Sequence, residues 1–133
     1  VLFRSLEQYA SATGLVRLAK RYFEKNTKNS ILTGKEITAK EVFDAAKAGD
    51  AAALEITEEF GAYLGQALVN LAATVDPAVF VIGGGVSKAG DILLETVRKY
   101  FYDHAFYGNQ KTKITLATLG NDAGIYGAAK QVL

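Results

Sequence analysis

DPAVFVIGGGVS, residues 76 to 87, is the stretch on which the fold depends. An apolar run from Ala78 to Ile82 follows a proline-marked turn and predicts a buried strand. Three glycines come next, and a helical pattern resumes near Lys88. Glycine has no Cβ and tolerates positive φ, so this turn lets backbone approach a ligand closely, and the helix start after it offers unpaired N–H groups to an anion. The candidate nucleotide-contacting residues are Gly83, Gly84 and Gly85.

Two common phosphate-binding motifs do not fit this glycine turn. If Gly83 opened a Walker A loop, the second glycine would fall on Lys88. If Gly83 opened the dinucleotide fingerprint, the last glycine would also fall on Lys88. On spacing alone, the three glycines fit a sharp strand-to-helix turn as well as they fit a ligand site.

The composition is that of one soluble globular domain. The chain has 133 residues, of which 50% are hydrophobic and 22% charged, and its formal net charge is +1. Such mixed charge gives no electrostatic footprint for nucleic acid or an anionic membrane. Without cysteines there are no disulfides or thiolate metal sites, which fits the cytoplasm, and a single histidine argues against a protein-only zinc site. The longest apolar segment, Gly61 to Val75, is too short for the roughly 20 residues of a membrane span.

Periodicity predicts five helices and two strands. A helix with one apolar face is expected from Leu6 to Phe23, followed by a polar loop over 26–37. Thr38 and Glu41 form a capping box for a short helix that ends at Gly49, and Asp50 caps a long helix over about 51–74. The remaining elements are an amphipathic helix from Ile92 to about Tyr102, a strand over 114–118, and a helix over 123–132 capped by Asp122.

This inventory has too few strands for an ordinary sheet. The strand, helix, strand order predicts a parallel pair, but sheets usually contain about four to six strands. By this count, strands are missing from the sheet.

Three motifs in order resemble the ROK family of bacterial glucokinases. They are LEQYASATGLVRLAK from Leu6, DPAVFVIGGGVSKAG from Asp76, and LGNDAGIYGAA from Leu119. The resemblance implies an α/β fold, namely part of a ribonuclease H-like, actin-like ATPase domain of the hexokinase type, with helices packed on a truncated sheet. It also implies a cytoplasmic enzyme that uses ATP and Mg²⁺ to phosphorylate the 6-hydroxyl of glucose or a similar hexose, and that forms a homodimer as the full-length protein.

The resemblance assigns roles to four residues. Glu7 matches the glutamate that contacts the sugar, although a carboxylate early in a helix is on spacing alone a surface group that compensates the helix dipole. Gly83, Gly84 and Gly85 match the glycines that face the nucleotide. His104 and Asp122 are read as a solvated histidine and a helix cap, not as catalytic groups.

The resemblance also predicts that the chain is a C-terminal fragment. Residues 1–5 (VLFRS) are expected to be a non-native leader, and residues 6–133 the C-terminal part of the large domain of a ROK sugar kinase. The family's catalytic aspartate, phosphate motif and zinc ligands belong upstream of Leu6, so no catalytic or metal-binding residue is predicted here and the chain alone is expected to be inactive. Two alternatives stay open: part of a ROK sugar-responsive transcriptional repressor, and a purely structural dimerisation module.

Overall fold

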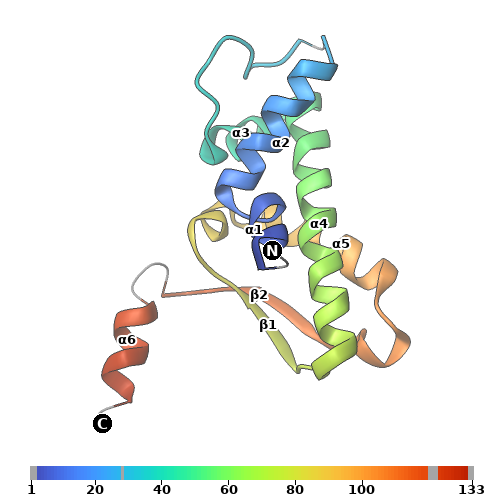
Figure 1. Cartoon of the computed structure of the whole chain (residues 1–133), viewed down its shortest axis with the longest axis vertical. Coiled ribbons are helices and arrows are strands. Elements are labelled where there is room, and N and C mark those ends of the chain that lie inside the picture. Colours follow the sequence, from blue (N-terminus) through green and yellow to red (C-terminus); the bar gives the residue numbers. More distant parts are fainter. Residues whose placement is uncertain (1–2, 28, 120–122, 132–133) are drawn as a thin grey trace.

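The computed structural model describes residues 3–27, 29–119 and 123–131. Its α-helices are α1 (Phe3–Tyr9), α2 (Ala12–Lys25), α3 (Ala39–Lys47), α4 (Ala51–Val75), α5 (Asp91–His104) and α6 (Ala123–Lys130). The strands are β1 (Val79–Ile82) and β2 (Lys113–Leu116), and two short 3₁₀ helices are η1 (Gly85–Ala89) and η2 (Tyr107–Asn109). Figure 1 shows α4 as the spine, with α1, α2 and α3 around its first half and the two strands beside its second half.

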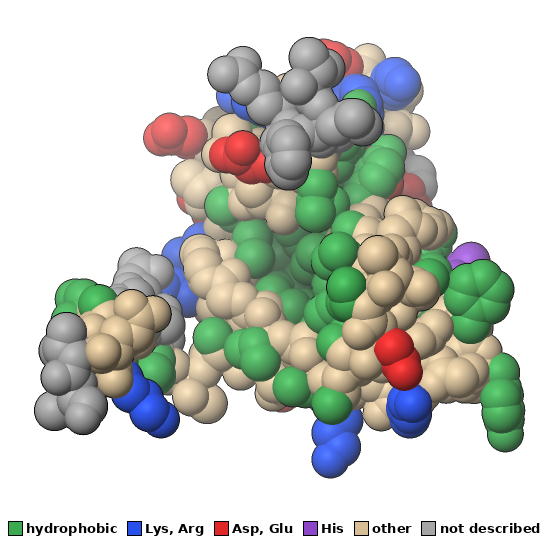
Figure 2. Space-filling model, turned by 60° about the horizontal axis from the view of Figure 1, so that its bottom comes forward, with side chains coloured by type: hydrophobic (Ala, Val, Ile, Leu, Met, Phe, Trp, Pro, Cys, Tyr) green, Lys and Arg blue, Asp and Glu red, His purple; other side chains and the backbone are tan. Residues whose placement is uncertain are grey.

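The two strands form the predicted parallel pair. Val79 lies opposite Lys113, and the register continues to Ile82 opposite Leu116. Alternation along the strands buries Ile82 and Ile114 on the face toward α4 and α5, where the Phe80 ring meets Phe101 edge-on at 6.0 Å between centroids. The opposite face of this small sheet carries Val79 and Val81, which are exposed. Figure 2 brings the lower side of Figure 1 forward and shows hydrophobic side chains gathered across the middle of that side.

The edge of β2 that faces away from β1 is covered by side chains from α5. Arg98 donates to the Ile114 carbonyl oxygen from Nη2 at 2.6 Å and from Nε at 3.2 Å. One turn later on the helix, the Tyr102 hydroxyl donates to the Thr112 carbonyl oxygen at 3.0 Å. Another strand would have to displace both side chains to pair with these carbonyl groups, so this edge is closed to further pairing.

Helix α4 packs closely against α5 because two glycines stand at the contact. A Cβ on Gly61 would lie 2.7 Å from the Thr96 Cβ, and one on Gly65 would lie 2.9 Å from the Tyr100 Cβ. The absence of side chains at these positions brings the two backbones together and helps enclose Phe60 and Phe101, which are fully buried.

The single helix expected from Leu6 to Phe23 is wrong, because the chain breaks between α1 and α2. Ser11 is extended and its side chain accepts a hydrogen bond from the Gly14 N–H at 3.0 Å, so it caps a new helix. Gly14 then lies against the end of α1, where a Cβ would be 2.7 Å from the Gln8 carbonyl oxygen and the Tyr9 carbonyl group. Gly14 is therefore the point of contact between the two helices.

The predicted caps of α3 and α4 are confirmed. Thr38 and Glu41 make the complete capping box. The Asp50 carboxylate accepts hydrogen bonds from the Ala53 N–H at 2.9 Å, the Ile31 N–H at 2.9 Å and the Ser30 hydroxyl at 3.0 Å. Burial by itself raises the pKa of Asp50, but these hydrogen bonds outweigh it and hold the pKa below its usual value. Asp50 thus ties the loop before α3 to the start of α4.

The amphipathic helix predicted from Ile92 to about Tyr102 is confirmed as α5, but the helical pattern that resumes near Lys88 is a separate 3₁₀ helix. The glycines lead into the five-residue η1, and α5 begins only after Gly90, which adopts φ +73°. A second positive-φ residue therefore separates the glycine turn from the amphipathic helix.

The last helix, α6, stands apart from the rest of the chain in Figure 1. Its side chains Ile125 and Tyr126 are 70% and 61% exposed. The predicted cap of this helix, Asp122, lies outside the described residues. Of the expected leader, Val1 and Leu2 also lie outside them, and Phe3 to Ser5 belong to α1. Across the described ranges, no helix combines the length and apolarity that crossing a membrane requires.

Candidate functional site

The glycine turn needs glycine at one position for its conformation. Gly84 adopts φ +77° and ψ −168°, which a residue with a side chain rarely adopts. The Ser87 hydroxyl donates to the Gly84 carbonyl oxygen at 2.7 Å, and the Ser87 N–H donates to the same oxygen at 3.2 Å. The turn is thereby fixed, while the space beside Gly84 and Gly85 is open to at least 4 Å. A ligand can approach the backbone here.

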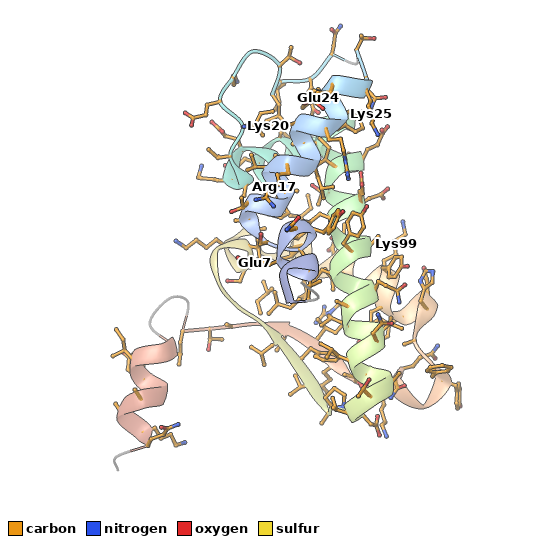
Figure 3. The ribbon with its side chains drawn as sticks, viewed as in Figure 1. Glu7, Arg17, Lys20, Glu24, Lys25 and Lys99 are labelled. Carbon is orange, nitrogen blue, oxygen red and sulfur yellow. The ribbon has the colours of Figure 1, made fainter. Side chains whose placement is uncertain are left out.

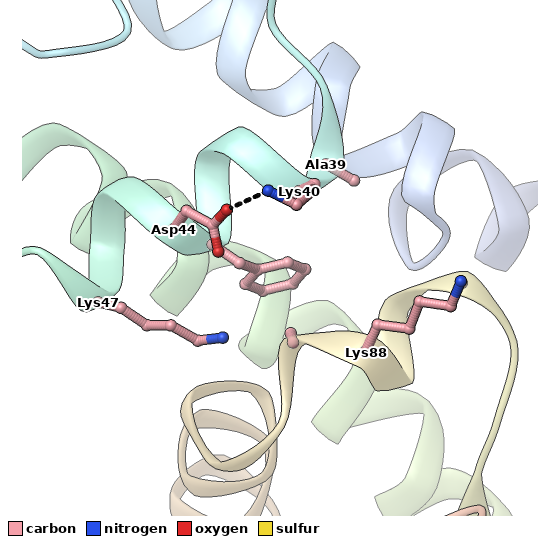
Figure 4. Close-up of a pocket in the computed structure, with 8 residues that line it drawn as sticks. Ala39, Lys40, Asp44, Lys47 and Lys88 are labelled. Atoms are coloured by element: carbon pink, nitrogen blue, oxygen red, sulfur yellow. Dashed lines mark hydrogen bonds and ion pairs between the residues drawn. The ribbon is translucent and has the colours of Figure 1, made fainter. Parts of the chain in front are cut away.

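A pocket of about 180 Å³ adjoins this turn, between α3 and η1. It is lined by Ala39, Lys40, Phe43, Asp44, Lys47, Gly85, Lys88 and Ala89. Figure 4 shows Lys40, Asp44 and Lys47 on α3, with Lys88 across from them on η1. Small-molecule pockets usually measure about 300–1,000 Å³, so this one has room for part of a nucleotide.

The charges around this pocket favour an anion. Lys40 donates to Asp44 at 2.8 Å, and this hydrogen bond raises the pKa of Lys40 and lowers that of Asp44, so both stay ionised. Lys47 and Lys88 form no ion pair with any described residue. Two cationic side chains that are outside the ion pairs of the described residues thus flank the apolar side chains of Phe43 and Ala89, although the charge of Lys47 also helps to lower the pKa of Asp44.

Glu7 lies in a second, more polar pocket of about 410 Å³. The lining residues are Glu7, Gln8, Ser11, Thr13 and Arg17, at the junction of α1 and α2. Figure 3 shows Glu7 on α1 below Arg17 on α2. Neither side chain is engaged in a hydrogen bond or ion pair with the described part of the chain, so both are available to a ligand.

Of the predicted site residues, Gly85 lines the pocket between α3 and η1 and Glu7 lines the polar pocket, and these two sets of lining residues do not overlap. Gly83 and Gly84 belong to neither set. The sequence reasoning missed Lys40, Lys47 and Arg17. A signal for the lysines existed, because residues seven apart on a helix share a face and Lys40 and Lys47 are seven apart on α3.

The described residues do not fit a metal ion. They contain no group of three or more His, Cys, Asp or Glu side chains placed to hold one. The only carboxylate lining the pocket beside the glycine turn, Asp44, is already bonded to Lys40.

Comparison with protein families gives one match over nearly the whole chain, the ROK family over residues 4–133. The chain belongs to the ROK family. Its membership explains why the three motifs occur in this order. The predicted α/β class is confirmed, because the solved structures that the chain resembles include ROK sugar kinases, which have the actin-like ATPase fold.

Glucokinases are prominent among its ROK relatives. The chain is 42% identical over 127 residues to the glucokinase of Halalkalibacterium halodurans, covering 92% of this chain and 38% of that protein. It superposes on a ROK family glucokinase from Streptomyces griseus in complex with glucose and AMPPNP with a TM-score of 0.84 at 35% identity, covering 95% of this chain and 43% of the other. A ROK family transcriptional regulator, a homologue of the E. coli MLC protein, gives a TM-score of 0.69 at 25% identity, covering 84% of this chain and 28% of the regulator. The chain thus spans about two-fifths of the length of the curated glucokinases it matches.

Proposed function

We propose that this ROK chain forms the nucleotide-facing part of the large domain of an ATP-dependent hexose kinase, with glucose as the sugar. The pocket between α3 and η1 carries the proposal. It joins an open glycine turn to Lys47 and Lys88, two cations that can attract an anion. Nucleotides supply both an apolar base for the pocket floor and phosphates for the lysines.

On the nucleotide side, Gly83, Gly84 and Gly85 would contact ATP through their backbone. The Gly84 conformation and the open space beside Gly85 support this role. The glucokinase from Streptomyces griseus, which was solved with AMPPNP, supports ATP as the donor. Because the pocket holds only part of a nucleotide, the remaining contacts would come from other parts of the enzyme.

On the sugar side, Glu7 would accept hydrogen bonds from sugar hydroxyls and fix the orientation of the substrate. Its exposed carboxylate in a polar pocket is suited to this role. The related glucokinases support glucose as the sugar.

Residues 6–133 alone would not catalyse the transfer. Phosphoryl transfer depends on positioning and on neutralising the charge of the phosphates, usually with Mg²⁺ and a carboxylate that orients the nucleophile. No described residues near the glycine turn provide this set. We expect a coupled ADP-release assay with glucose, ATP and Mg²⁺ to give no turnover above a blank without protein. Turnover above the blank would refute the assignment of the catalytic residues to another part of the enzyme.

Nucleotide binding can be tested separately from catalysis. Titration of ATP should shift the amide NMR signals of the glycine turn and of the α3 residues that line the pocket. Exposed charge pairs contribute about 0.2–1 kcal/mol, so Lys47→Ala and Lys88→Ala should each weaken binding by up to about fivefold. Lys113→Ala removes the same charge from β2 and should leave binding unchanged. Shifts confined to other regions, or equal effects of all three variants, would refute the nucleotide site.

A regulator is the second candidate, and the match to the ROK transcriptional regulator favours it. The kinase remains preferred because the glucokinases match this chain at higher identity and TM-score. If the full-length protein binds its sugar but does not consume ATP, the regulator would replace the kinase.

A further inference from the structure

Asp44 differs from every other described residue that lines the pocket between α3 and η1, because its side chain accepts hydrogen bonds. The three lysines of the lining, Lys40, Lys47 and Lys88, carry three donors each and no acceptor. The rest of the lining is glycine, alanine and phenylalanine. Within this lining, a ligand hydroxyl group can therefore donate to a side chain only at Asp44.

The Asp44 carboxylate is held in position and keeps one oxygen available. Lys40 donates to its Oδ2 at 2.8 Å from one turn earlier on α3, while Oδ1 bonds to none of the described residues. The hydrogen bond from Lys40 and the charges of Lys40 and Lys47 lower the pKa of Asp44. The carboxylate is therefore ionised at neutral pH and can only accept.

Asp44 adjoins both of the surfaces that suit the two ends of a nucleotide. Its neighbour Phe43 offers apolar surface for a base, and Lys47, one turn further along α3, offers positive charge for phosphates. Figure 4 shows Asp44 between Lys40 and Lys47, with Lys88 across the pocket. In a nucleotide, the ribose separates the base from the phosphates, and its 2′ and 3′ hydroxyl groups are neighbouring hydrogen-bond donors.

We propose that Asp44 accepts hydrogen bonds from the ribose diol of the bound nucleotide, so that this pocket prefers nucleotides that carry both ribose hydroxyl groups. The inference rests on the nucleotide site of the proposed function, and it adds the part of the nucleotide that Asp44 recognises. A carboxylate suits this role because its two oxygens can accept from two adjacent hydroxyl groups. Lys40 contributes as a positioning residue, since it holds the carboxylate through Oδ2.

Binding of ATP and of 2′,3′-dideoxy-ATP tests the proposal directly. The two nucleotides have the same base and the same charge, and they differ only in the two hydroxyl groups. Titrations followed through the amide NMR signals of α3 and of the glycine turn give a dissociation constant for each. The Asp44 side chain is 50% exposed, so water competes for it, and the parent should bind ATP about three- to tenfold more tightly than the dideoxynucleotide. In Asp44→Ala, the two nucleotides should bind alike.

Two further variants separate recognition from general effects on the fold. Asp44→Glu keeps a carboxylate and should still bind ATP more tightly than the dideoxynucleotide. Glu36→Ala removes a carboxylate that does not line the pocket and should leave both affinities unchanged. Because the measured quantity is a ratio of two affinities of one protein, a change in stability or in net charge affects both values alike.

The possible failures point to different errors. Equal binding of the two nucleotides by the parent would overturn the role of Asp44 and leave the nucleotide site in place. An undiminished preference for ATP in Asp44→Ala would overturn it too, because another group would then recognise the ribose. If ATP shifts no signals of α3 or the glycine turn, both this inference and the nucleotide site itself are wrong.

Discussion

Replacing Gly61 with alanine should destabilise the protein through the contact between α4 and α5. The new Cβ would lie 2.7 Å from the Thr96 Cβ and 3.1 Å from the Thr96 carbonyl carbon, whereas carbon atoms pack best at about 3.5–4.0 Å. Thr96 is held in place, because its hydroxyl donates to the Ile92 and Leu93 carbonyl oxygens, both at 3.0 Å. The clash can therefore be relieved only by moving the helices apart.

Two opposing effects determine how much the free energy of unfolding of Gly61→Ala decreases. Alanine favours a helix interior over glycine by about 1 kcal/mol, and overpacking of a close contact costs about 1–3 kcal/mol. Because a backbone atom takes part in this contact, the cost should fall in the upper half of that range. The free energy of unfolding of Gly61→Ala should then decrease by about 1–2 kcal/mol, which lowers the Tm by about 3–8 °C for a chain of this size.

Urea unfolding followed by circular dichroism measures this change. Gly127→Ala is the matched control, since Gly127 is also helical but a Cβ there would meet nothing within 4 Å. It should cause no loss of stability. If Gly61→Ala proves as stable as the parent, or both variants behave alike, the close contact at Gly61 does not constrain the fold and the reasoning fails.

Three further substitutions probe other parts of the fold. Asp50→Ala should lower the free energy of unfolding by about 0.5–2 kcal/mol at pH 7. Because the pKa of Asp50 is lowered in the folded state, the difference between parent and variant should shrink as the pH falls below about 4. Urea unfolding that shows the same difference between the two proteins at pH 7 and at pH 2.5 would contradict this. Thr57→Val should be neutral or stabilise by up to about 1 kcal/mol in the same unfolding assay, because the buried Thr57 hydroxyl bonds to none of the described residues. Gly14→Ala should loosen α1, seen as faster amide exchange in α1, because its Cβ would meet rigid backbone; unchanged exchange would refute this.

The features that local sequence determines were predictable. The capping box of Thr38 and Glu41 and the cap at Asp50 each depend on residues within one turn of a helix, and both are confirmed. The parallel pairing of β1 and β2 followed from the order of the elements. These predictions needed no knowledge of tertiary contacts.

The features that were missed depend on residues far apart in the sequence. Apolar spacing continues through the break at Ser11, so periodicity alone indicated one helix, and the contact of Gly14 with the end of α1 becomes visible only in three dimensions. The pocket beside the glycine turn joins α3 to η1 across about 40 residues of sequence, so reasoning from DPAVFVIGGGVS located Gly85 and missed Lys47. The proposed roles of Glu7 and the three glycines came from the family resemblance and stay predictions.

The cover that Arg98 and Tyr102 place over β2 also limits how copies of this chain can associate. A strand pair with two open edges can pair with another copy at each edge, so copies can add without limit and grow into a filament. Because side chains from α5 close the β2 edge, only the β1 edge can pair with another copy. Association through β1 therefore stops at a dimer of two strand pairs. Arg98 and Tyr102 together therefore prevent growth at this edge, and only removal of both side chains should allow association of copies to become open-ended.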